Sequence, residues 1–253
     1  MITIIDNGST PQNRSVLEKL LPEGVRYVPL GNNFGWGGGF NTVLGDWLSS
    51  GPGEFCFISA HDAWPEPGCL NRLAEAFHSD ERLGIVSPHY GDNHLPVFSP
   101  IRGPKLVRVD PRPSGTIECV DWVHGTLMGL RKACLKEIGL FDNRYFAYGD
   151  EQALCLRANR RGWKTAIVWD AIVGNPGTSV PTPLLLYLQT RGTLLLASDY
   201  GGKLSGLTRT ALIVMNTAWL VVAGKLHRDA AIARMRAVRD FLLGRFGKPR
   251  HIK

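Results

Sequence analysis

Short apolar runs alternate with amphipathic segments through the first two thirds of the chain. Runs rich in branched and aromatic residues are typical of buried strands, and apolar positions three or four apart are typical of helices. The predicted strands are Ile2–Ile5, Val25–Pro29, Phe55–Ser59, Gly84–Pro88 and Trp163–Trp169. The predicted helices between them cover Gln12–Leu21, a segment through Trp47, and Gly68–Phe77. The alternation predicts an α/β fold with a mostly parallel, doubly wound, Rossmann-like sheet, which binds ligands at the carboxyl ends of its strands.

The second half of the chain is less regular. The stretch His89–Thr116 is rich in Pro, Gly and Arg and predicts irregular or hairpin structure, and Glu118–Leu130 is strand-like with a break at Gly125. The pattern then predicts helices from Lys132, over Asp150–Arg161 and over Leu184–Ala197, followed by basic helices. We therefore predict one α/β domain over residues 1–197 and a basic, partly amphipathic helical extension over residues 198–253.

The composition fits a single folded domain with a basic end. Of 253 residues, 44% are apolar and 20% charged, which is enough for one buried core and argues against disorder. The net charge of +7 is concentrated in the C-terminal stretch, where Lys and Arg far outnumber the two aspartates Asp229 and Asp240. Such a stretch suits water, a membrane surface or nucleic acid. No nucleic-acid motif accompanies it, so we expect no nucleic-acid partner.

Other features bear on where the protein works. The five cysteines form no CxxC and no metal spacing with His, so free thiols in a reducing compartment are expected. The chain opens without a signal peptide. The apolar segment Leu207–Leu226 is interrupted by Arg209, Asn216 and Lys225, which fits a packed or interfacial helix better than a transmembrane one. A cytoplasmic protein is expected, with peripheral contact at the inner face of the membrane as the alternative.

Two polar clusters lie in the first 41 residues. Asp6-Asn7-Gly8-Ser9-Thr10 follows the first strand, where a carboxylate can accept hydrogen bonds from a base or ribose; a turn with a helix cap explains the same residues equally well. The stretch Asn33–Asn41 has four glycines in five positions, which let the backbone approach a ligand near a helix start. The spacing is not the dinucleotide fingerprint, and a surface loop is the alternative.

Two further clusters carry carboxylates. Ala60-His61-Asp62 follows the strand Phe55–Ser59, where Asp or His can hold a divalent metal that bridges a diphosphate, or can simply be a cap and a loop residue. Tyr148-Gly149-Asp150-Glu151 sets adjacent carboxylates at a helix start. One of them can be a general base for an acceptor hydroxyl, or both can only complement the helix dipole.

The order of these motifs resembles glycosyltransferase family 2, and within it the rhamnosyltransferase-like branch. The resemblance runs from Ile2 to Leu196 and is most specific from Val123-His-Gly-Thr-Leu-Met-Gly to Gly139-Leu-Phe-Asp-Asn-Arg-Tyr-Phe-Ala-Tyr-Gly-Asp-Glu. It implies a GT-A fold and an inverting transfer of sugar from a nucleotide sugar, with a dTDP- or UDP-sugar such as dTDP-rhamnose as donor. The acceptor would be a hydroxyl of a glycan, a glycolipid or a small molecule, and the cofactor Mg²⁺ or Mn²⁺.

The resemblance also implies roles for individual residues. Asp6 would contact the nucleobase, and Asp62, with His61 beside it, would hold the metal. Glu151 would be the general base with Asp150 as the alternative, because the family order of the acidic pair is reversed here. The other implied nucleotide-sugar contacts are Asn7, Gly8, Ser9, Asn33, Gly35, Gly38, Asn41, Gly125, Thr126 and Arg191.

Three departures from the family pattern bear on activity. Ala60 replaces the first polar member of the metal motif, and Gly174-Asn175 stands where the family commonly has a His. Family members also begin with a further strand and helix, so either the start is assigned late or a unit of roughly 30 residues is absent. Loss of a central strand would leave an unpaired edge and favour a homodimer.

These departures keep a second class of function open, a non-catalytic GT-A-like protein that binds a nucleotide sugar or a partner enzyme. A nucleotidyltransferase with a related sheet is a third and weaker alternative, because its Gly-rich, basic N-terminal signature is absent.

Overall fold

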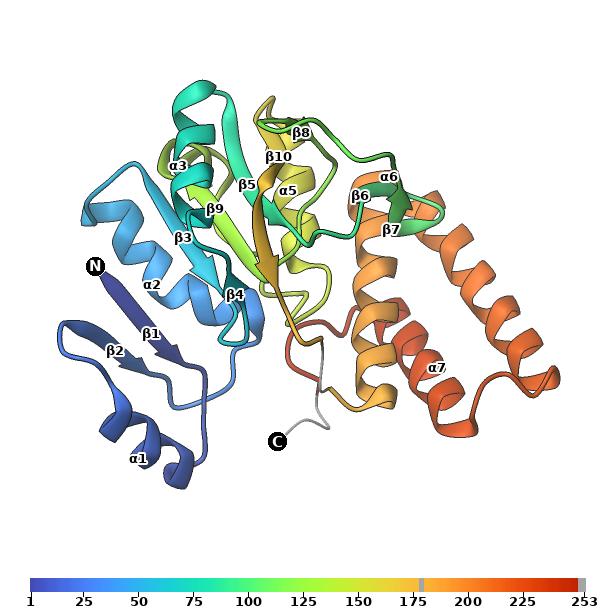
Figure 1. The fold of residues 1–253 in the computed structure, drawn as a ribbon. Coiled ribbons are helices and arrows are strands. Elements are labelled where there is room, and N and C mark those ends of the chain that lie inside the picture. The colour runs from blue at the N-terminus through green and yellow to red at the C-terminus, as the bar shows by residue number, and fades with distance from the viewer. Residues whose placement is uncertain (178–179, 250–253) are drawn as a thin grey trace.

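The computed structural model of the chain describes residues 1–177 and 180–249 (Figure 1). In chain order its elements are β1 (Ile2–Asp6), α1 (Pro11–Leu20), β2 (Val25–Pro29), α2 (Trp36–Ser50), β3 (Phe55–Ser59), β4 (Trp64–Pro65), α3 (Cys69–Ser79), β5 (Leu83–His89), β6 (His94–Ser99), β7 (Gly103–Arg108), β8 (Ile117–Cys119), β9 (Leu127–Arg131), α4 (Lys132–Ile138), α5 (Asp150–Arg160), β10 (Lys164–Gly174), α6 (Thr182–Val222) and α7 (Arg228–Leu242). The predicted strands and helices are all present, and two strands, Val25–Pro29 and Phe55–Ser59, have the predicted bounds. The stretch His89–Thr116 contains the β6–β7 hairpin.

The central sheet has the strand order β3-β9-β5-β10-β4, with β8 also paired to β10. The predicted α/β fold is present, but the central sheet is mixed rather than mostly parallel. Among the described strands of this sheet, only β5 and β10 pair in parallel, and β9 runs antiparallel between β3 and β5. Leu127, the first residue of β9, lies opposite Ser59, the last of β3. The start of β9 therefore lies on the same edge as the carboxyl ends of β3, β5 and β10, which is the edge that binds ligands in such sheets.

The first two strands form a sheet of their own. Strands β1 and β2 pair in parallel from Ile2 opposite Val25 to Asp6 opposite Pro29. Among the described residues, β1 makes no ladder with β3, which is the terminal strand of the central sheet. Figure 1 shows the β1–β2 sheet at the lower left, with α2 running between it and β3. The two sheets are thus joined through α2 and the loops around it rather than through backbone pairing.

Helices cover both faces of the central sheet. The apolar side chains of Ile85, Met128, Leu130 and Ile167 are almost fully buried in the sheet. Leu73 and Phe77 of α3 belong to one core cluster, and Leu135 of α4 and Leu154 of α5 belong to another. Because packing fixes the sheet on both sides, the loops at its carboxyl edge are held on a rigid base.

The C-terminal part is a helical hairpin packed on the α/β domain. Helix α6 runs across the predicted boundary at residues 197 and 198 and kinks at Gly202, where φ is 83°. Helix α7 packs back on it through Ala233 and Ala237 (Figure 1). Within the described residues, α6 is the one helix with the length and apolar composition of a membrane span, and 22% of its most apolar window is buried. Residues 250–253 of the predicted extension lie outside the described residues.

Candidate active site

The loop that precedes α5 is held in an uncommon backbone conformation. Phe146 and Tyr148 have left-handed φ angles of 64° and 61°, and Gly149 has a φ of 118°. Non-glycine residues rarely adopt such angles, and the surrounding structure must impose them. Here the rings of Tyr145 and Phe146 are buried, and a Cβ on Gly149 would meet the Tyr145 ring at 2.7 Å. Burial of the aromatic rings thus fixes where Asp150 and Glu151 enter the helix.

Asp150 is buried and bound to the protein backbone. Its carboxylate is 2% exposed, and its Oδ2 accepts a hydrogen bond from the Gly37 N–H at 2.8 Å. Gly37 lies in the first turn of α2, whose N–H groups have no partners within the helix. Asp150 therefore satisfies the N-terminus of α2, and its orientation is fixed by that bond.

Glu151 is partly exposed and has a strongly perturbed pKa. Burial raises the pKa of Glu151 well above its usual range, and the charge of Asp150 raises it further. A carboxylate with a raised pKa is a stronger base near neutral pH. Of the adjacent pair, Glu151 is the more exposed.

Asp62 lies at the carboxyl end of β3, on the edge that also carries the end of β10. Its Oδ1 accepts a hydrogen bond from Asn175 Nδ2 at 3.1 Å, and the Asn175 Oδ1 accepts from the Gly177 N–H at 2.7 Å. His61 beside it is exposed. No group of three or more His, Cys, Asp or Glu side chains with metal-binding geometry occurs in the described residues. The groups beside Asp62 that could bind a metal are therefore its own carboxylate, the Asn175 amide and the exposed His61 imidazole.

Tyr90, just after β5, connects the two acidic positions, and the sequence reasoning missed it. Its hydroxyl hydrogen-bonds the Thr126 hydroxyl. Burial raises the pKa of Tyr90 most, and the nearby carboxylates of Glu151, Asp92 and Asp62 add to the rise. The charges of both Glu151 and Asp62 thus act on the pKa of Tyr90. Its position directly after a buried strand was the signal that would have found it.

Thr126 and Gly125 lie at the start of β9, between these groups. The Thr126 carbonyl accepts the Ala60 N–H at 2.8 Å, which joins β9 to the Ala60-His61-Asp62 turn. A Cβ on Gly125 would come within 2.9 Å of the Trp36 ring. The ring of His124 next to them packs at a tilt against the Tyr90 ring, with centroids 4.4 Å apart, and burial lowers the pKa of His124 to about 4. An imidazole with that pKa is neutral at pH 7 and can accept or donate a hydrogen bond there.

The turn after β1 is held by its own hydrogen bonds. Asp6 accepts from the Ser9 N–H, the Arg14 guanidinium and the Tyr27 hydroxyl at 2.8, 3.1 and 2.9 Å. Burial disfavours the charge on Asp6, but these hydrogen bonds outweigh it and lower its pKa to about 2. Gly8 has a φ of 88°, and a Cβ there would meet the Asn32 backbone at 2.7 Å. Asp6 is therefore ionised and engaged with protein donors, and its contact with a nucleobase stays a prediction.

The glycine-rich loop is attached to this turn and to the loop before α5. Asn7 donates to the Gly35 carbonyl at 2.7 Å, and Asn33 Oδ1 accepts the Gly35 N–H at 2.8 Å. A Cβ on Gly35 would lie 1.9 Å from the Phe146 carbonyl oxygen. Close packing therefore requires glycine here.

The following helix turn is fixed to the same loop before α5. Asn41 makes two hydrogen bonds with the Phe141 backbone, at 2.8 and 3.0 Å, and one with the Asn143 side chain at 3.1 Å. A Cβ on Gly38 would approach Asn143 Oδ1 at 3.3 Å. The glycine-rich segment thus joins the β1–β2 sheet to the loop that carries Asp150 and Glu151.

Arg191 lies in α6, away from the sheet edge. It is 2% exposed, and its guanidinium donates to the Tyr187 hydroxyl at 3.2 Å and to the Gly247 carbonyl at 2.6 Å. These contacts fasten the segment after α7 to α6. A contact between Arg191 and the nucleotide sugar stays a prediction.

The predicted site residues therefore form two joined groups. At the carboxyl edge of the central sheet, Thr126 hydrogen-bonds Tyr90, and the charges of Glu151 and Asp62 act on the same tyrosine. The remaining predicted donor contacts, apart from Gly125 and Arg191, line the turn after β1 and the glycine-rich segment, and Asp150 joins that segment to α5.

Comparisons with known proteins agree with this geometry. A model of glycosyl transferase family 2 matches residues 1–135. N-acetylglucosaminyl-diphospho-decaprenol L-rhamnosyltransferase of Mycobacterium tuberculosis is 26% identical over 200 residues, which are 68% of this chain and 65% of that protein. The low-salt glycan biosynthesis hexosyltransferase Agl10 of Haloferax volcanii is 23% identical over 232 residues, 87% of this chain and 74% of that protein. The chain thus spans slightly less than two thirds of the rhamnosyltransferase.

Solved structures show the same fold at low sequence identity. GalNAc-T7 with UDP, GalNAc and Mn²⁺ has a TM-score of 0.57 and 14% identity, over 80% of this chain and 44% of that one. The mannosyltransferase PcManGT from Pyrobaculum calidifontis, in complex with GDP-Man and Mn²⁺, has a TM-score of 0.56 and 15% identity, over 96% and 77%. The family match covers more than half of the chain, and the fold agrees with it. The chain belongs to glycosyl transferase family 2.

Proposed function

We propose that the protein is an inverting glycosyltransferase that moves a sugar from a nucleotide sugar to an acceptor hydroxyl. The observation that carries this proposal is the difference in environment between the adjacent acids Asp150 and Glu151. Asp150 is fixed to the backbone of α2, whereas Glu151 is partly exposed with a raised pKa, next to the edge that carries Asp62. The family relationship supports the same chemistry.

In the proposed reaction Glu151 acts as the general base. Its carboxylate takes the proton of the acceptor hydroxyl while the hydroxyl oxygen forms a bond to the anomeric carbon of the donor. The bond from that carbon to the diphosphate oxygen breaks at the same time, and the nucleoside diphosphate leaves with the electron pair. Because attack and departure occur on opposite faces, the anomeric configuration inverts. Asp150 keeps Glu151 basic through its adjacent charge.

A divalent cation fits the edge at Asp62. Mg²⁺ and Mn²⁺ are often held by one or two carboxylates together with substrate phosphates, and Asp62 supplies one carboxylate there. Similar solved structures contain Mn²⁺. A bound cation would stabilise the charge of the departing diphosphate. Asn175 would orient Asp62 through its hydrogen bond, and His61 is exposed enough to reach a phosphate.

The donor is proposed to be a dTDP- or UDP-sugar, with dTDP-rhamnose as the first candidate, because a relative is named as an L-rhamnosyltransferase. The nucleotide would lie along the turn after β1 and the glycine-rich segment, with Gly125 and Thr126 beside the diphosphate. The acceptor is proposed to be a glycan or a glycolipid, which agrees with the names of both curated relatives.

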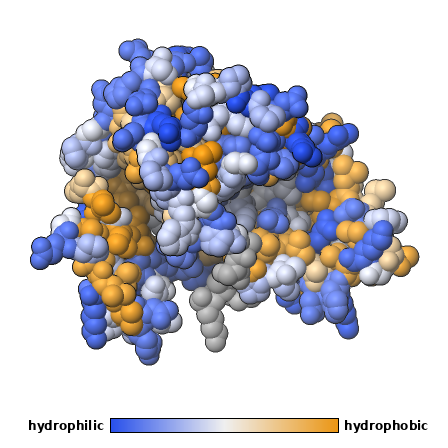
Figure 2. Space-filling model, viewed as in Figure 1, coloured by the Kyte–Doolittle hydropathy of each residue, from blue (hydrophilic) through white to orange (hydrophobic). Residues whose placement is uncertain are grey.

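We further propose that the protein works in the cytoplasm with its C-terminal hairpin at the inner face of the membrane. Apolar residues gather over α6 and α7 in Figure 2. Leu204, Leu207, Met215, Trp219 and Val222 of α6 are all more than half exposed. Helix α7 presents exposed arginines, including Arg236 and Arg239. Exposed apolar and basic side chains on one hairpin suit an anionic lipid surface.

One assay tests the activity. The purified protein is incubated with UDP-, dTDP- and GDP-sugars and Mg²⁺ or Mn²⁺, and nucleoside diphosphate release and the thermal shift are followed. We expect turnover with one donor and a loss of at least about 100-fold in Glu151→Gln, because general bases contribute about 10²–10⁴-fold.

The second candidate, a non-catalytic nucleotide-sugar-binding protein, is favoured by Ala60 and by the single carboxylate at Asp62. It predicts a thermal shift with a nucleotide sugar, no release of nucleoside diphosphate, and no effect of Glu151→Gln.

A further inference from the structure

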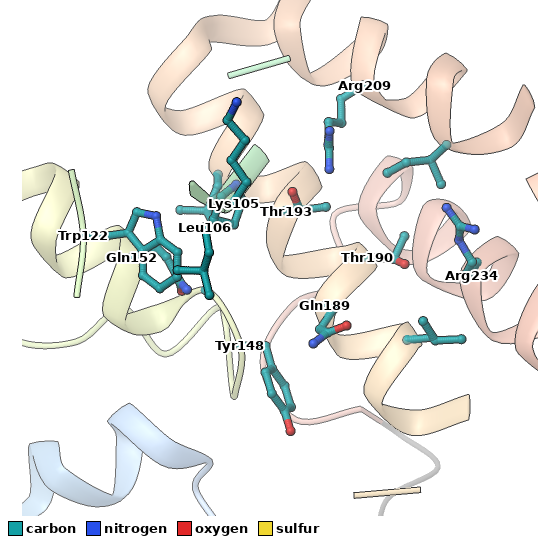
Figure 3. A pocket seen from close by; sticks show the side chains of 15 residues that line it. Lys105, Leu106, Trp122, Tyr148, Gln152, Gln189, Thr190, Thr193, Arg209 and Arg234 are labelled. Carbon is teal, nitrogen blue, oxygen red and sulfur yellow. The ribbon is translucent and has the colours of Figure 1, made fainter. Parts of the chain in front are cut away.

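A cavity of about 530 Å³ lies between β7, α5, α6 and α7. It begins at Tyr148, Gly149 and Gln152, which flank the Asp150–Glu151 pair in the chain, and extends to Arg209 and Arg234 in the C-terminal hairpin. Figure 3 shows Arg209 and Arg234 entering it from separate helices, with Thr193 and Thr190 between them. The cavity therefore joins the start of α5 to the apolar hairpin.

The end of the cavity at the C-terminal hairpin is positively charged, and no acidic side chain of the described residues neutralises it there. Arg209, Arg234 and Lys105 line it, and no acidic residue is among its lining side chains in the described part of the chain. None of the three takes part in an ion pair within residues 1–177 and 180–249. Burial lowers the pKa of both arginines, and the charge of Arg234 lowers that of Arg209 further. Two half-buried like charges cost free energy that a bound anion would recover.

Hydrogen-bonding atoms in the cavity also lack protein partners. Arg209 Nε, Thr193 Oγ1 and Gln152 Oε1 are all buried without one. The Arg209 N–H and the Thr193 hydroxyl can donate to a phosphate oxygen, whereas Gln152 Oε1 can accept from a hydroxyl. Buried polar atoms are normally satisfied, so these three point to a polar ligand. The two hydrogen-bond donors lie at the cationic end, and the hydrogen-bond acceptor belongs to Gln152, which follows Glu151 in the chain.

Exposed apolar side chains lie on the helix that supplies the cationic end. Arg209 and Ile213 line the cavity, and Leu212, Met215 and Trp219 of the same helix are exposed outside it. A ligand that filled the cavity from Gln152 outwards would meet a hydroxyl-accepting group and then two guanidinium groups, with the exposed apolar side chains of the hairpin beyond the cavity. That order matches a sugar joined through phosphate to a hydrocarbon chain.

We propose that this cavity binds the phosphate groups of a lipid-linked acceptor, with Arg209 and Arg234 on the phosphates and the acceptor sugar beside Gln152 and Glu151. The inference rests on the proposed glycosyl transfer for the role of Glu151. It adds a phosphate linkage in the lipid acceptor and two residues that recognise it.

The test measures binding without a donor, so that it does not depend on turnover. Farnesyl diphosphate, below its micelle concentration, is titrated calorimetrically into the wild-type chain, Arg209→Gln, Arg234→Gln and the control Arg161→Gln. Arg161 is exposed at the C-terminal end of α5 and does not line the cavity. We expect each cavity variant to weaken binding at least tenfold and Arg161→Gln to change it less than twofold.

Further arms identify the ligand and check the fold. Farnesol tests the hydrocarbon alone and inorganic pyrophosphate the phosphates alone, and we expect both to bind at least tenfold more weakly than farnesyl diphosphate. Thermal unfolding checks each variant, because Arg209 also bonds the Ile101 carbonyl; Arg209→Lys, which keeps the charge, should retain part of the affinity. Unchanged affinity in both glutamine variants would overturn the proposal, as would pyrophosphate binding as tightly as farnesyl diphosphate. Donor-free binding that depends on the arginines, with no turnover in any donor assay, would refute the transferase function but not the anion site.

Discussion

The carboxylate of Asp150 accepts a hydrogen bond from the backbone N–H of Gly37 at 2.8 Å, across 113 residues of sequence. This bond ties the first turn of α2 to the first turn of α5. It also separates the roles of two adjacent acids, because it holds Asp150 in the protein interior and leaves Glu151 partly exposed.

The stability of two Asp150 variants should differ because of this bond. Asp150→Asn keeps an oxygen that can accept the Gly37 N–H, whereas Asp150→Ala leaves that buried donor without a partner. Both remove the charge, so we expect Asp150→Ala to be less stable than Asp150→Asn by about 1–3 kcal/mol. Urea unfolding measures the difference. Asp46→Ala is the control, because Asp46 is exposed in α2, and equal stability of the two Asp150 variants would show that the bond contributes nothing.

The pH dependence of turnover should report the raised pKa of Glu151. The base must be ionised, so kcat/KM should fall as the pH drops through that pKa, which lies well above the ordinary value of 4.5. Removing the neighbouring negative charge favours ionisation, so the acid limb of Asp150→Asn should move to lower pH. Initial rates across a pH series measure the acid limb of the wild type and that of Asp150→Asn. A limb that stays in place in Asp150→Asn contradicts the electrostatic coupling of the two acids.

Metal dependence should pass through Asp62. In Asp62→Ala we expect the Mn²⁺ concentration for half-maximal activity to rise at least tenfold, because a carboxylate ligand is lost. Asn175→Ala should raise it less, since Asn175 acts only through its hydrogen bond to Asp62. Titration of Mn²⁺ under a fixed donor concentration gives these values. Asp110→Ala, an exposed acid on the loop after β7, serves as the control, and an unchanged titration in Asp62→Ala would place the metal elsewhere.

Gly35, at the start of α2, and Gly45, within α2, should respond in opposite ways to substitution by alanine. Gly35 has a φ of 84°, and a Cβ there would lie 1.9 Å from the Phe146 carbonyl oxygen. We expect Gly35→Ala to lose about 3 kcal/mol or more through strain and overpacking. Gly45 is exposed in α2 with open space around it, so Gly45→Ala should gain about 0.5–1 kcal/mol of helix stability. Thermal and urea unfolding measure both. A Gly35→Ala variant as stable as the wild type would mean that the loop moves freely away from Phe146.

The sequence by itself determined the elements and the family. Runs such as Phe55–Ser59 are apolar throughout and short, so local side-chain pattern and length are enough to identify a buried strand. The acidic pair at the start of α5 and the apolar positions within that helix likewise set its bounds to within a residue. Motif order then indicated the family, since the order of turns, glycines and acids follows from one chain topology.

The tertiary structure alone decided which atoms meet. The direction of β9 depends on which edge the chain returns to, and no local pattern encodes it. Tyr90 joins the site only because β5 ends beside the start of β9, and Arg209 meets Arg234 only because α6 kinks and α7 folds back. The proposal of Glu151 rather than Asp150 as the base rests on the bond from Gly37 to Asp150, which connects distant segments. Periodicity reports the environment of one element, whereas catalytic geometry depends on packing between elements, and this information appears only when the chain is folded.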